Sequence, residues 1–137
     1  MKQEEILIAS LQKFMGASPF IKALKIELVE VDPSNEALVM RMPMQDLVER
    51  GAGSKQMHGG AVASLIDTAG CFSLIMGRVS PVPTINFRVD YLRPVSKTDA
   101  IAHAFVRRAG KAVGVVDVDV KSEEGALLAV GRGSFGL

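Results

Sequence analysis

Residues 58–77 read HGGAVASLIDTAGCFSLIMG, and this stretch decides the fold of the chain. Apolar residues recur through it at helical spacing, and its opposite side is nearly apolar too, which is typical of a helix buried on most sides. A membrane-spanning helix needs ~20 apolar residues, and a carboxylate such as Asp67 in mid-span would be costly. We therefore expect a long buried helix over residues 59–77 of a soluble domain that does not enter a membrane. The apolar stripe of this helix comprises Val62, Leu65, Ile66, Ala69, Phe72 and Met76.

Strands are predicted on both sides of this helix. Residues 24–32 alternate between apolar and polar and predict a strand, and the turn signal in 32–35 separates it from a second strand over 37–42. After the helix, a strand over 84–92 places apolar residues on one face and polar residues, Thr84 among them, on the other. Further strands are predicted over residues 98–108, 111–121 and 126–135, with turns at 109–111 and 122–125.

The N-terminal part of the chain and the segment before the central helix are less regular. An amphipathic helix is predicted over 4–16, where a glycine ends it. A Ser-Pro pair at 18–19 is typical of the start of a short helical turn, which we expect to continue to Ala23. Residues 43–57 contain glycine and serine without a clean period and predict a loop.

Together these elements predict the α+β class, with one long helix and five to six strands in an antiparallel sheet. The 137 residues fit a single domain, residues 1–137, that begins with the N-terminal helix. An antiparallel sheet in a chain of this size covers only part of a helix that is apolar on most sides. A sheet wrapped around its helix, completed by a second copy of the chain, would bury the remainder.

Composition excludes several classes of function. The formal net charge of +1 is too small for a nucleic-acid binder, which must neutralise several phosphates. The single cysteine, Cys71, cannot form an intramolecular disulfide, and no Cys/His cluster indicates a metal site. Two acids at positions 4 and 5 argue against a signal peptide. We expect a cytoplasmic protein that uses no metal and no cofactor.

The start of the central helix carries the features of a site for a developing negative charge. His58 stands where an N-cap residue belongs, and Gly59 and Gly60 remove side chains from the first turn. The first backbone N–H groups of a helix have no partner within it, and the positive end of the helix dipole lies behind them. Such groups can stabilise a carbonyl oxygen that becomes negative during a reaction.

Asp67 is the single charged residue between positions 59 and 77, and it follows His58 by nine positions. Along a helix this separation is ~13–14 Å of rise and brings Asp67 to the opposite side from the helix start. The carboxylate therefore does not act on a carbonyl held by its own Gly59. Either the two features are unrelated, or a symmetry-related chain supplies one of them. We favour a two-fold homodimer, in which antiparallel helices would bring Asp67 of one chain near Gly59 of the other.

The motif His58-Gly59-Gly60-x-x-x-x-Leu65-x-Asp67 resembles the central-helix motif of hotdog-fold thioesterases of the phenylacetate-degradation (PaaI) type. The strand ending in Tyr-Leu-Arg-Pro at 91–94, the Gly-Lys turn at 110–111 and the Gly-Arg pair at 131–132 are similar to that family as well, so that the resemblance covers roughly residues 36–135. It implies a hotdog fold and a dimer that often pairs into a tetramer. It also implies a hydrolase that cleaves acyl-CoA thioesters.

The resemblance further implies roles for individual residues. The Gly59 N–H group would polarise the thioester carbonyl, and Asp67 of the partner chain would be the nucleophile or general base. His58 would position the thioester or support the turn, and Thr84 falls where a hydroxyl residue helps to orient water in such enzymes. The residues expected to contact CoA are Gly60, Tyr91, Arg93, Arg108, Gly110 and Lys111.

One departure from the family pattern lies in the loop before His58. Family members often carry an Asn about six residues before the His, and position 52 is Ala here. Gln56 or Ser54 can substitute as the polar partner. A non-catalytic acyl-CoA binding or sensing module, which would keep the pocket without positioning water, is the alternative function. For the enzyme, the expected substrate carries a small to medium acyl or aryl-acyl group.

Structural alternatives are open for several of these residues. The lone acid of the helix can be hydrogen-bonded to Thr68 or Ser64, which would offset the cost of burying it. Thr84 can serve only as a β-former at the start of its strand, and the basic segment 107–111 can be a solvated hairpin. Structural roles are favoured for His103 and Cys71.

Overall fold

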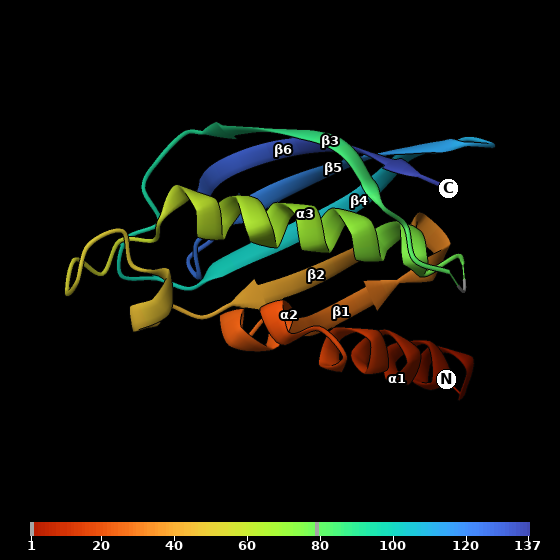
Figure 1. The fold of residues 1–137 in the computed structure, drawn as a ribbon, viewed down its shortest axis with the longest axis horizontal. Helices are drawn as coiled ribbons and strands as arrows, with labels where there is room; N and C mark the ends of the chain where they lie inside the picture. Colours follow the sequence, from red (N-terminus) through yellow and green to blue (C-terminus); the bar gives the residue numbers. More distant parts are fainter. Residues whose placement is uncertain (1, 79) are drawn as a thin grey trace.

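The computed structural model describes residues 2–78 and 80–137. In these residues a six-stranded antiparallel sheet, in the order β1-β2-β4-β5-β6-β3, lies against a long helix, so that the predicted α+β class is confirmed (Figure 1). The strands are β1 (Glu27–Asp32), β2 (Ala37–Met42), β3 (Thr84–Tyr91), β4 (Ala100–Ala109), β5 (Val113–Lys121) and β6 (Leu127–Gly136). The helices are α1 (Lys2–Gly16), α2 (Pro19–Leu24) and α3 (Gly59–Ile75), with short 3-10 helices η1 (Pro33–Asn35) and η2 (Asp46–Val48).

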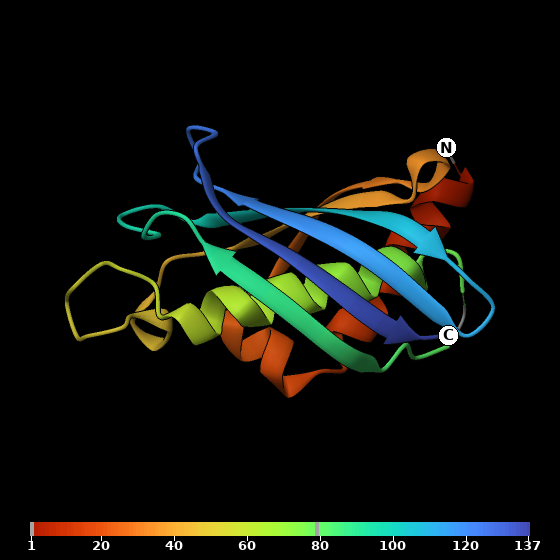
Figure 2. The same ribbon diagram turned by 90° about the horizontal axis from the view of Figure 1, so that it is seen from above.

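Helix α3 lies along one face of the sheet, and the side chains between them form the core (Figure 2). Glycines in two strands let the helix approach closely. A Cβ at Gly131 would lie 2.6 Å from Cγ2 of Ile66, and one at Gly114 would lie 2.8 Å from Cδ1 of Leu74. Carbon atoms prefer separations of about 3.5–4.0 Å, so side chains at these positions would push the helix outward. The seating of α3 on β5 and β6 therefore sets where its polar residues fall.

The first strand begins later than predicted. Helix α2 continues to Leu24 because Ser18 caps it, accepting a backbone hydrogen bond at 3.2 Å, and Pro19 occupies the first helical position. Lys25 ends the helix in the left-handed conformation, with φ 57°. The predicted strand is therefore wrong over residues 24–26, where helix capping prevails over the alternating pattern.

The other predicted elements lie close to the observed ones. Helix α3 ends at Ile75 instead of residue 77, and the remaining strands agree with their predicted ranges to within two residues at either end. The predicted loop over 43–57 contains η2, which the sequence did not indicate. Beyond η2, the Glu49 carboxylate accepts backbone N–H groups from Gly53 at 3.2 Å and Lys55 at 2.7 Å, and this ordering explains the return of the loop toward α3.

Strand β3 forms one edge of the sheet and is paired on one side only, with β6. Its register shifts between Thr84 and Asn86, and the Thr84 side chain contacts α3 instead of sharing the face of Asn86 as the alternation predicts. Two large apolar side chains of this strand remain in contact with solvent, Ile85 at 56% and Phe87 at 39% exposure. Exposed apolar edge strands tend to pair with another chain.

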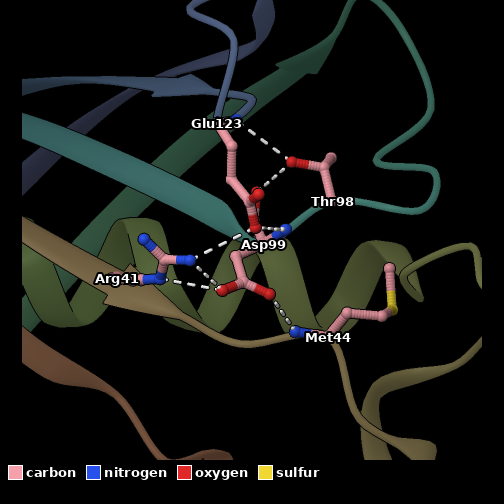
Figure 3. Close-up of polar contacts among 5 residues, drawn as sticks. All are labelled: Arg41, Met44, Thr98, Asp99 and Glu123. Atoms are coloured by element: carbon pink, nitrogen blue, oxygen red, sulfur yellow. Dashed lines mark hydrogen bonds and ion pairs between the residues drawn. The ribbon is translucent and has the colours of Figure 1, made fainter.

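A network of polar contacts joins three segments, which are residues 41–44, residues 98–99 and the turn that contains Glu123 (Figure 3). The Asp99 carboxylate accepts hydrogen bonds from Arg41 Nε and from the backbone N–H of Met44, each at 2.8 Å. Glu123 accepts from the backbone N–H of Asp99 at 3.0 Å, and Thr98 Oγ1 accepts from the backbone N–H of Glu123 at 3.0 Å. Partial burial by itself would raise the pKa of Asp99, but the Met44 and Arg41 donors outweigh it and hold that pKa below its usual value.

We expect Asp99→Asn to lower the free energy of unfolding by about 1–2 kcal/mol at pH 7, because an amide replaces a carboxylate that accepts charge-assisted hydrogen bonds. Because the pKa is depressed in the folded state, the carboxylate stabilises the fold above its unfolded pKa of about 3.9. That contribution is lost as the pH falls through the folded pKa. Urea unfolding of both proteins at pH 7 and near pH 3 should show a difference that shrinks at the lower pH. Glu124→Gln, in the exposed turn nearby, is the control, and equal stabilities at pH 7 would contradict the assignment.

Candidate active site

The first turn of α3 is held in place by its own cap. His58 has the extended N-cap conformation, φ −60° and ψ 137°, and its Nδ1 accepts the backbone N–H of Gly60 at 2.8 Å. An accepting Nδ1 carries no proton, so the neutral ring has its proton on Nε2. The backbone N–H of His58 donates to the carbonyl of Val48 at 2.7 Å, which ties the helix start to η2. The predicted N-cap role of His58 is therefore confirmed.

Gly59 presents a free donor at this turn. Within residues 2–78 and 80–137, no acceptor is assigned to its backbone N–H, whereas its carbonyl accepts the Tyr91 hydroxyl at 2.6 Å. A Cβ at position 59 would lie 3.3 Å from the Tyr91 oxygen, so only glycine fits here without displacing the phenol. Burial raises the pKa of Tyr91, which keeps the phenol protonated as a donor. The Gly59 N–H group thus has a fixed direction and no protein partner in the described chain.

A groove of about 490 Å³ opens beside Gly59, between α3, β3 and the two loops that follow η2 and β3. Two arginines, Arg50 and Arg93, give it positive charge, and Arg50 also donates to Gln56 Oε1 at 3.4 Å. An anion or a polar chain would find both charge and donors here. The complete lining is Arg50, Gln56, Met57, His58, Gly59, Val62, Tyr91, Leu92, Arg93, Pro94 and Val95.

Asp67 is half-buried on α3, and its Oδ1 accepts the Thr84 hydroxyl at 2.6 Å. The alternative partners on its own helix do not bond to it in the structure, since the Ser64 hydroxyl donates to the Gly60 carbonyl at 2.8 Å. The sequence did not predict this contact, because Thr84 was expected only where a hydroxyl residue helps to orient water. This hydrogen bond orients the carboxylate and leaves its second oxygen for another group.

The structure does not bring Asp67 and Gly59 of one chain together. Eight residues of α3 separate them, or ~12 Å of helical rise. Each is instead tied to a different end of β3, Asp67 through Thr84 and Gly59 through Tyr91. Within one chain the Gly59 turn and the Asp67–Thr84 pair, here called the two half-sites, therefore lie apart, in agreement with the spacing argument from the sequence.

The basic turn after β4 also lies apart from Gly59. Gly114, just beyond this turn, faces Leu74 near the C-terminal end of α3, whereas Gly59 begins that helix. The predicted CoA-contacting residues at this turn, which are Arg108, Gly110 and Lys111, therefore belong to the Asp67 end of the chain, while Gly60, Tyr91 and Arg93 belong to the Gly59 end.

Both Arg50 and Gln56 line the groove, although Gln56 was named from the sequence only as a polar substitute for the absent Asn, and Arg50 was not named at all. They come into position because Gln56 pairs with Ser96 and the backbone N–H of Met57 donates to the carbonyl of Val95 at 2.8 Å. These contacts link segments about 40 residues apart, and no local hydrophobic periodicity in the sequence predicts them. The polarity of Gln56 in the loop before His58 was the signal that could have found them.

Cys71 and His103, for which structural roles were predicted, have surroundings that fit such roles. Cys71 is half-buried instead of fully in the core, and its thiol donates to the Val82 carbonyl at 3.2 Å. Burial, together with the negative charge of Asp67, raises the pKa of Cys71 to about 11, so the thiol stays protonated. His103 is half-buried on β4 opposite Asp119, and burial lowers its pKa.

No helix in 2–78 and 80–137 has the length and hydropathy needed to cross a membrane. Across the same ranges, no three side chains of His, Cys, Asp or Glu group in a way that could hold a metal ion.

Comparison with known proteins identifies similar chains. The sequence profile of the thioesterase superfamily matches residues 55–129. A putative esterase of Halobacterium salinarum, VNG_1336C, is 39% identical over 76% of this chain and 76% of its own length. The acyl-coenzyme A thioesterase PaaI of Escherichia coli is 34% identical over 82% of this chain and 77% of its own length. The crystal structure of the Haemophilus influenzae thioesterase HI1161 matches with a TM-score of 0.84 and 21% identity over 94% of this chain and 88% of its own, a likeness of fold.

The cap on α3 can be tested by substitution. We expect His58→Ala to lower the free energy of unfolding by about 1 kcal/mol, because the Gly60 N–H loses its acceptor. His58→Asn should recover most of that loss, since an Asn side-chain oxygen can accept the same hydrogen bond. Urea titrations of the three proteins measure both effects. Equal losses in the two variants would show that capping is not what the imidazole contributes to stability.

Proposed function

Because the chain belongs to the thioesterase superfamily and is a thioester hydrolase, we propose that it hydrolyses acyl-CoA at a site shared by two subunits of a homodimer. Gly59 of one subunit would hold the thioester carbonyl, and Asp67 of the partner subunit would attack it or activate water. The observation that carries this proposal is the attachment of the two half-sites to opposite ends of one edge strand. Neither half-site contains both an oxyanion donor and a carboxylate.

Strand β3 offers the simplest way to join the half-sites. If two copies of β3 pair antiparallel about a two-fold axis near their midpoints, the Thr84 end of one strand lies alongside the Tyr91 end of the other. Asp67 would then approach the Gly59 turn of the partner subunit. The unpaired edge and the exposed side chains of Ile85 and Phe87 support this pairing, because burial would remove them from water.

The uncovered face of α3 supports the same arrangement. Its residues Gly60, Ala63, Ser64 and Cys71 are small and lie on the side of Asp67, away from the sheet, and none is fully buried. A second copy could come close to a helix face of this kind. The hotdog sheet of the partner would then enclose the two helices, which burial of apolar surface favours.

The chemistry follows from the groups at this junction. The thioester carbonyl oxygen would accept the Gly59 N–H, whose direction is fixed by the His58 cap and reinforced by the helix dipole. The Asp67 carboxylate, oriented by Thr84, would attack the carbonyl carbon directly or take a proton from an attacking water. In the direct route the C–S bond breaks as a mixed anhydride forms between the acyl group and Asp67, and a water molecule then hydrolyses that anhydride to two carboxylates while a proton released from the water goes to the CoA thiolate. In the water route the C–S bond breaks as the acyl group becomes a carboxylic acid, and the proton that Asp67 took from the water goes to the CoA thiolate. His58 Nε2–H would position the thioester.

The CoA portion is proposed to occupy the groove with Arg50 and Arg93, in contact with Tyr91. Gly60, which was also expected to contact CoA, does not line this groove. The basic turn at 108–111 would act from the Asp67 end of the partner subunit. Gln56 lines the groove in the loop where the family often has Asn, and its amide would serve as the polar group there. We further propose a small to medium acyl or aryl-acyl substrate, and a cytoplasmic enzyme whose dimers pair into tetramers.

The proposal is tested with a panel of acyl-CoA thioesters and detection of the released thiol. We expect the wild type to hydrolyse members of the panel and Asp67→Asn to lower kcat by about 10²–10⁴-fold, because the amide can neither attack nor accept a proton. Asp90→Asn, an exposed acid on β3, is the control and should retain activity. No turnover of any acyl-CoA by the wild type, or full activity of Asp67→Asn, would refute the proposal.

The sharing of the site is tested by mixing two inactive proteins. Gly59→Pro removes the proposed donor, and proline suits the first helical position after the extended His58, although its Cβ would also shift the Tyr91 phenol. We expect this variant to lose about 10²–10³-fold in kcat. Unfolding and refolding it with an equal amount of Asp67→Asn should restore about one quarter of wild-type activity, because half of the dimers are mixed and each has one intact site. A site contained within one chain would gain nothing from mixing.

A further inference from the structure

A second hollow flanks the start of α3, on the side away from β3. Its volume is about 420 Å³, within the range of about 300–1,000 Å³ of small-molecule sites. Helix α2 and η2 form one wall, and the first two turns of α3 form the other. The lining is Phe20, Ala23, Leu24, Leu47, Val48, His58, Gly60, Ala61 and Ser64.

This hollow differs in chemistry from the groove beside Gly59. None of its lining residues is an acid, a lysine or an arginine, whereas the groove contains Arg50 and Arg93. The one hydroxyl in the lining, that of Ser64, donates to the Gly60 carbonyl at 2.8 Å and so has no proton left to donate to a ligand. The hollow therefore favours an apolar group that makes no hydrogen bonds.

Two large apolar side chains stand at the hollow in contact with water. Phe20, which belongs to α2, is 59% exposed, and Leu47, which belongs to η2, is 64% exposed. Both side chains belong to segments that hydrogen bonds hold in place. Ser18 caps α2, and Gln45 Nε2 donates to the carbonyl of Ala23 at 3.1 Å, so that α2 is tied to the segment leading into η2. A preformed apolar wall favours ligand binding because little ordering is needed.

The groove and the hollow meet at the helix start. His58 lines both, Gly59 lines the groove and Gly60 lines the hollow, so a thioester held at the Gly59 N–H has one opening on each side. Acyl-CoA has the same division, with a polar, charged CoA portion on one side of the thioester and an acyl group on the other. Helix α2 lies on the side of α3 opposite β3, so that pairing of β3 edges does not use the wall formed by α2 and η2 (Figure 1). Gly60 and Ser64 in the other wall belong to the face of α3 that the second copy is proposed to approach, so that the partner subunit would border the hollow there.

We propose, resting on the proposed function, that the hollow between α2, η2 and α3 binds the acyl group and that its occupant is an unbranched aliphatic chain of medium length. Phe20 and Leu47 are the specificity-determining residues, while Arg50 and Arg93 take the polar end of the substrate. A charged or strongly polar acyl group would lose its hydration in this hollow without gaining a partner. The walls thus select chain length and apolar character, and the helix start selects the thioester.

The test compares kcat/KM across a saturated series from acetyl-CoA to dodecanoyl-CoA. In the wild type kcat/KM should rise by about fourfold per methylene until the hollow is filled, the factor expected for burying one CH₂ group. Leu47→Trp narrows the hollow and should lower the octanoyl-to-acetyl ratio of kcat/KM by about tenfold or more. Phe20→Ala removes one wall and should flatten the same series. Both side chains are largely exposed, so these substitutions are not expected to unfold the protein.

Ile6→Trp is the matched control, because Ile6 on α1 has nearly the same exposure as Leu47, 60% against 64%, and lies outside the hollow. Its chain-length series should follow that of the wild type. If Leu47→Trp and Phe20→Ala hydrolyse the series with wild-type ratios, the acyl group binds elsewhere, and the inference fails while the proposed function stands. If the wild type hydrolyses no member of the series, the proposed function fails, and the inference fails with it.

Discussion

The whole structure depends on the burial of one helix that is apolar on nearly every side. A single sheet covers the side that carries Leu65 and Ile66, and glycines in the strands let it come close enough to do so. The same sheet cannot also cover the side that carries Asp67. That side stays partly open, as does the edge strand β3 next to it. The apolar surface left over is the physical reason to expect a second copy, and the functional groups lie where that copy would arrive.

The start of α3 is rigid before any ligand binds. Its cap is an imidazole nitrogen instead of the hydroxyl or carboxylate oxygen that most N-caps use, which leaves the opposite ring nitrogen with the proton. The backbone around Gly59 is held from both sides, by the carbonyl of Val48 through His58 and by the Tyr91 hydroxyl. An N–H group fixed in this way can stabilise an oxyanion without reorganising during the reaction, which is where most electrostatic catalysis arises.

The sequence predicted features that depend on residues close together in the chain, and it missed features that form where distant segments meet. The long helix, its cap at His58 and the isolation of Asp67 all follow from patterns within 20 residues, and each is found in the structure. The start of β1 was misplaced because helix capping at Ser18 prevailed over alternation in the same residues. The groove and the hollow could not be predicted from the sequence, because they exist only where the loop before His58 meets segments from other parts of the chain.

Because the groove and the hollow differ in chemistry, they determine which way round a thioester substrate binds at the start of α3. A thioester carries an acyl group on one side of its carbonyl and the CoA portion on the other, and hydrolysis requires one face of that carbonyl to be turned toward the carboxylate. If the acyl group and the CoA portion exchanged places, an aliphatic chain would lie against Arg50 and Arg93, and a polar chain would lie between Phe20 and Leu47. Both placements leave polar groups without partners, which costs far more than a displaced methylene. Orientation is then decided away from the reacting atoms, by surfaces that α2 and the loop before His58 provide. The few groups at the centre, a glycine N–H and a carboxylate, need only to be in reach.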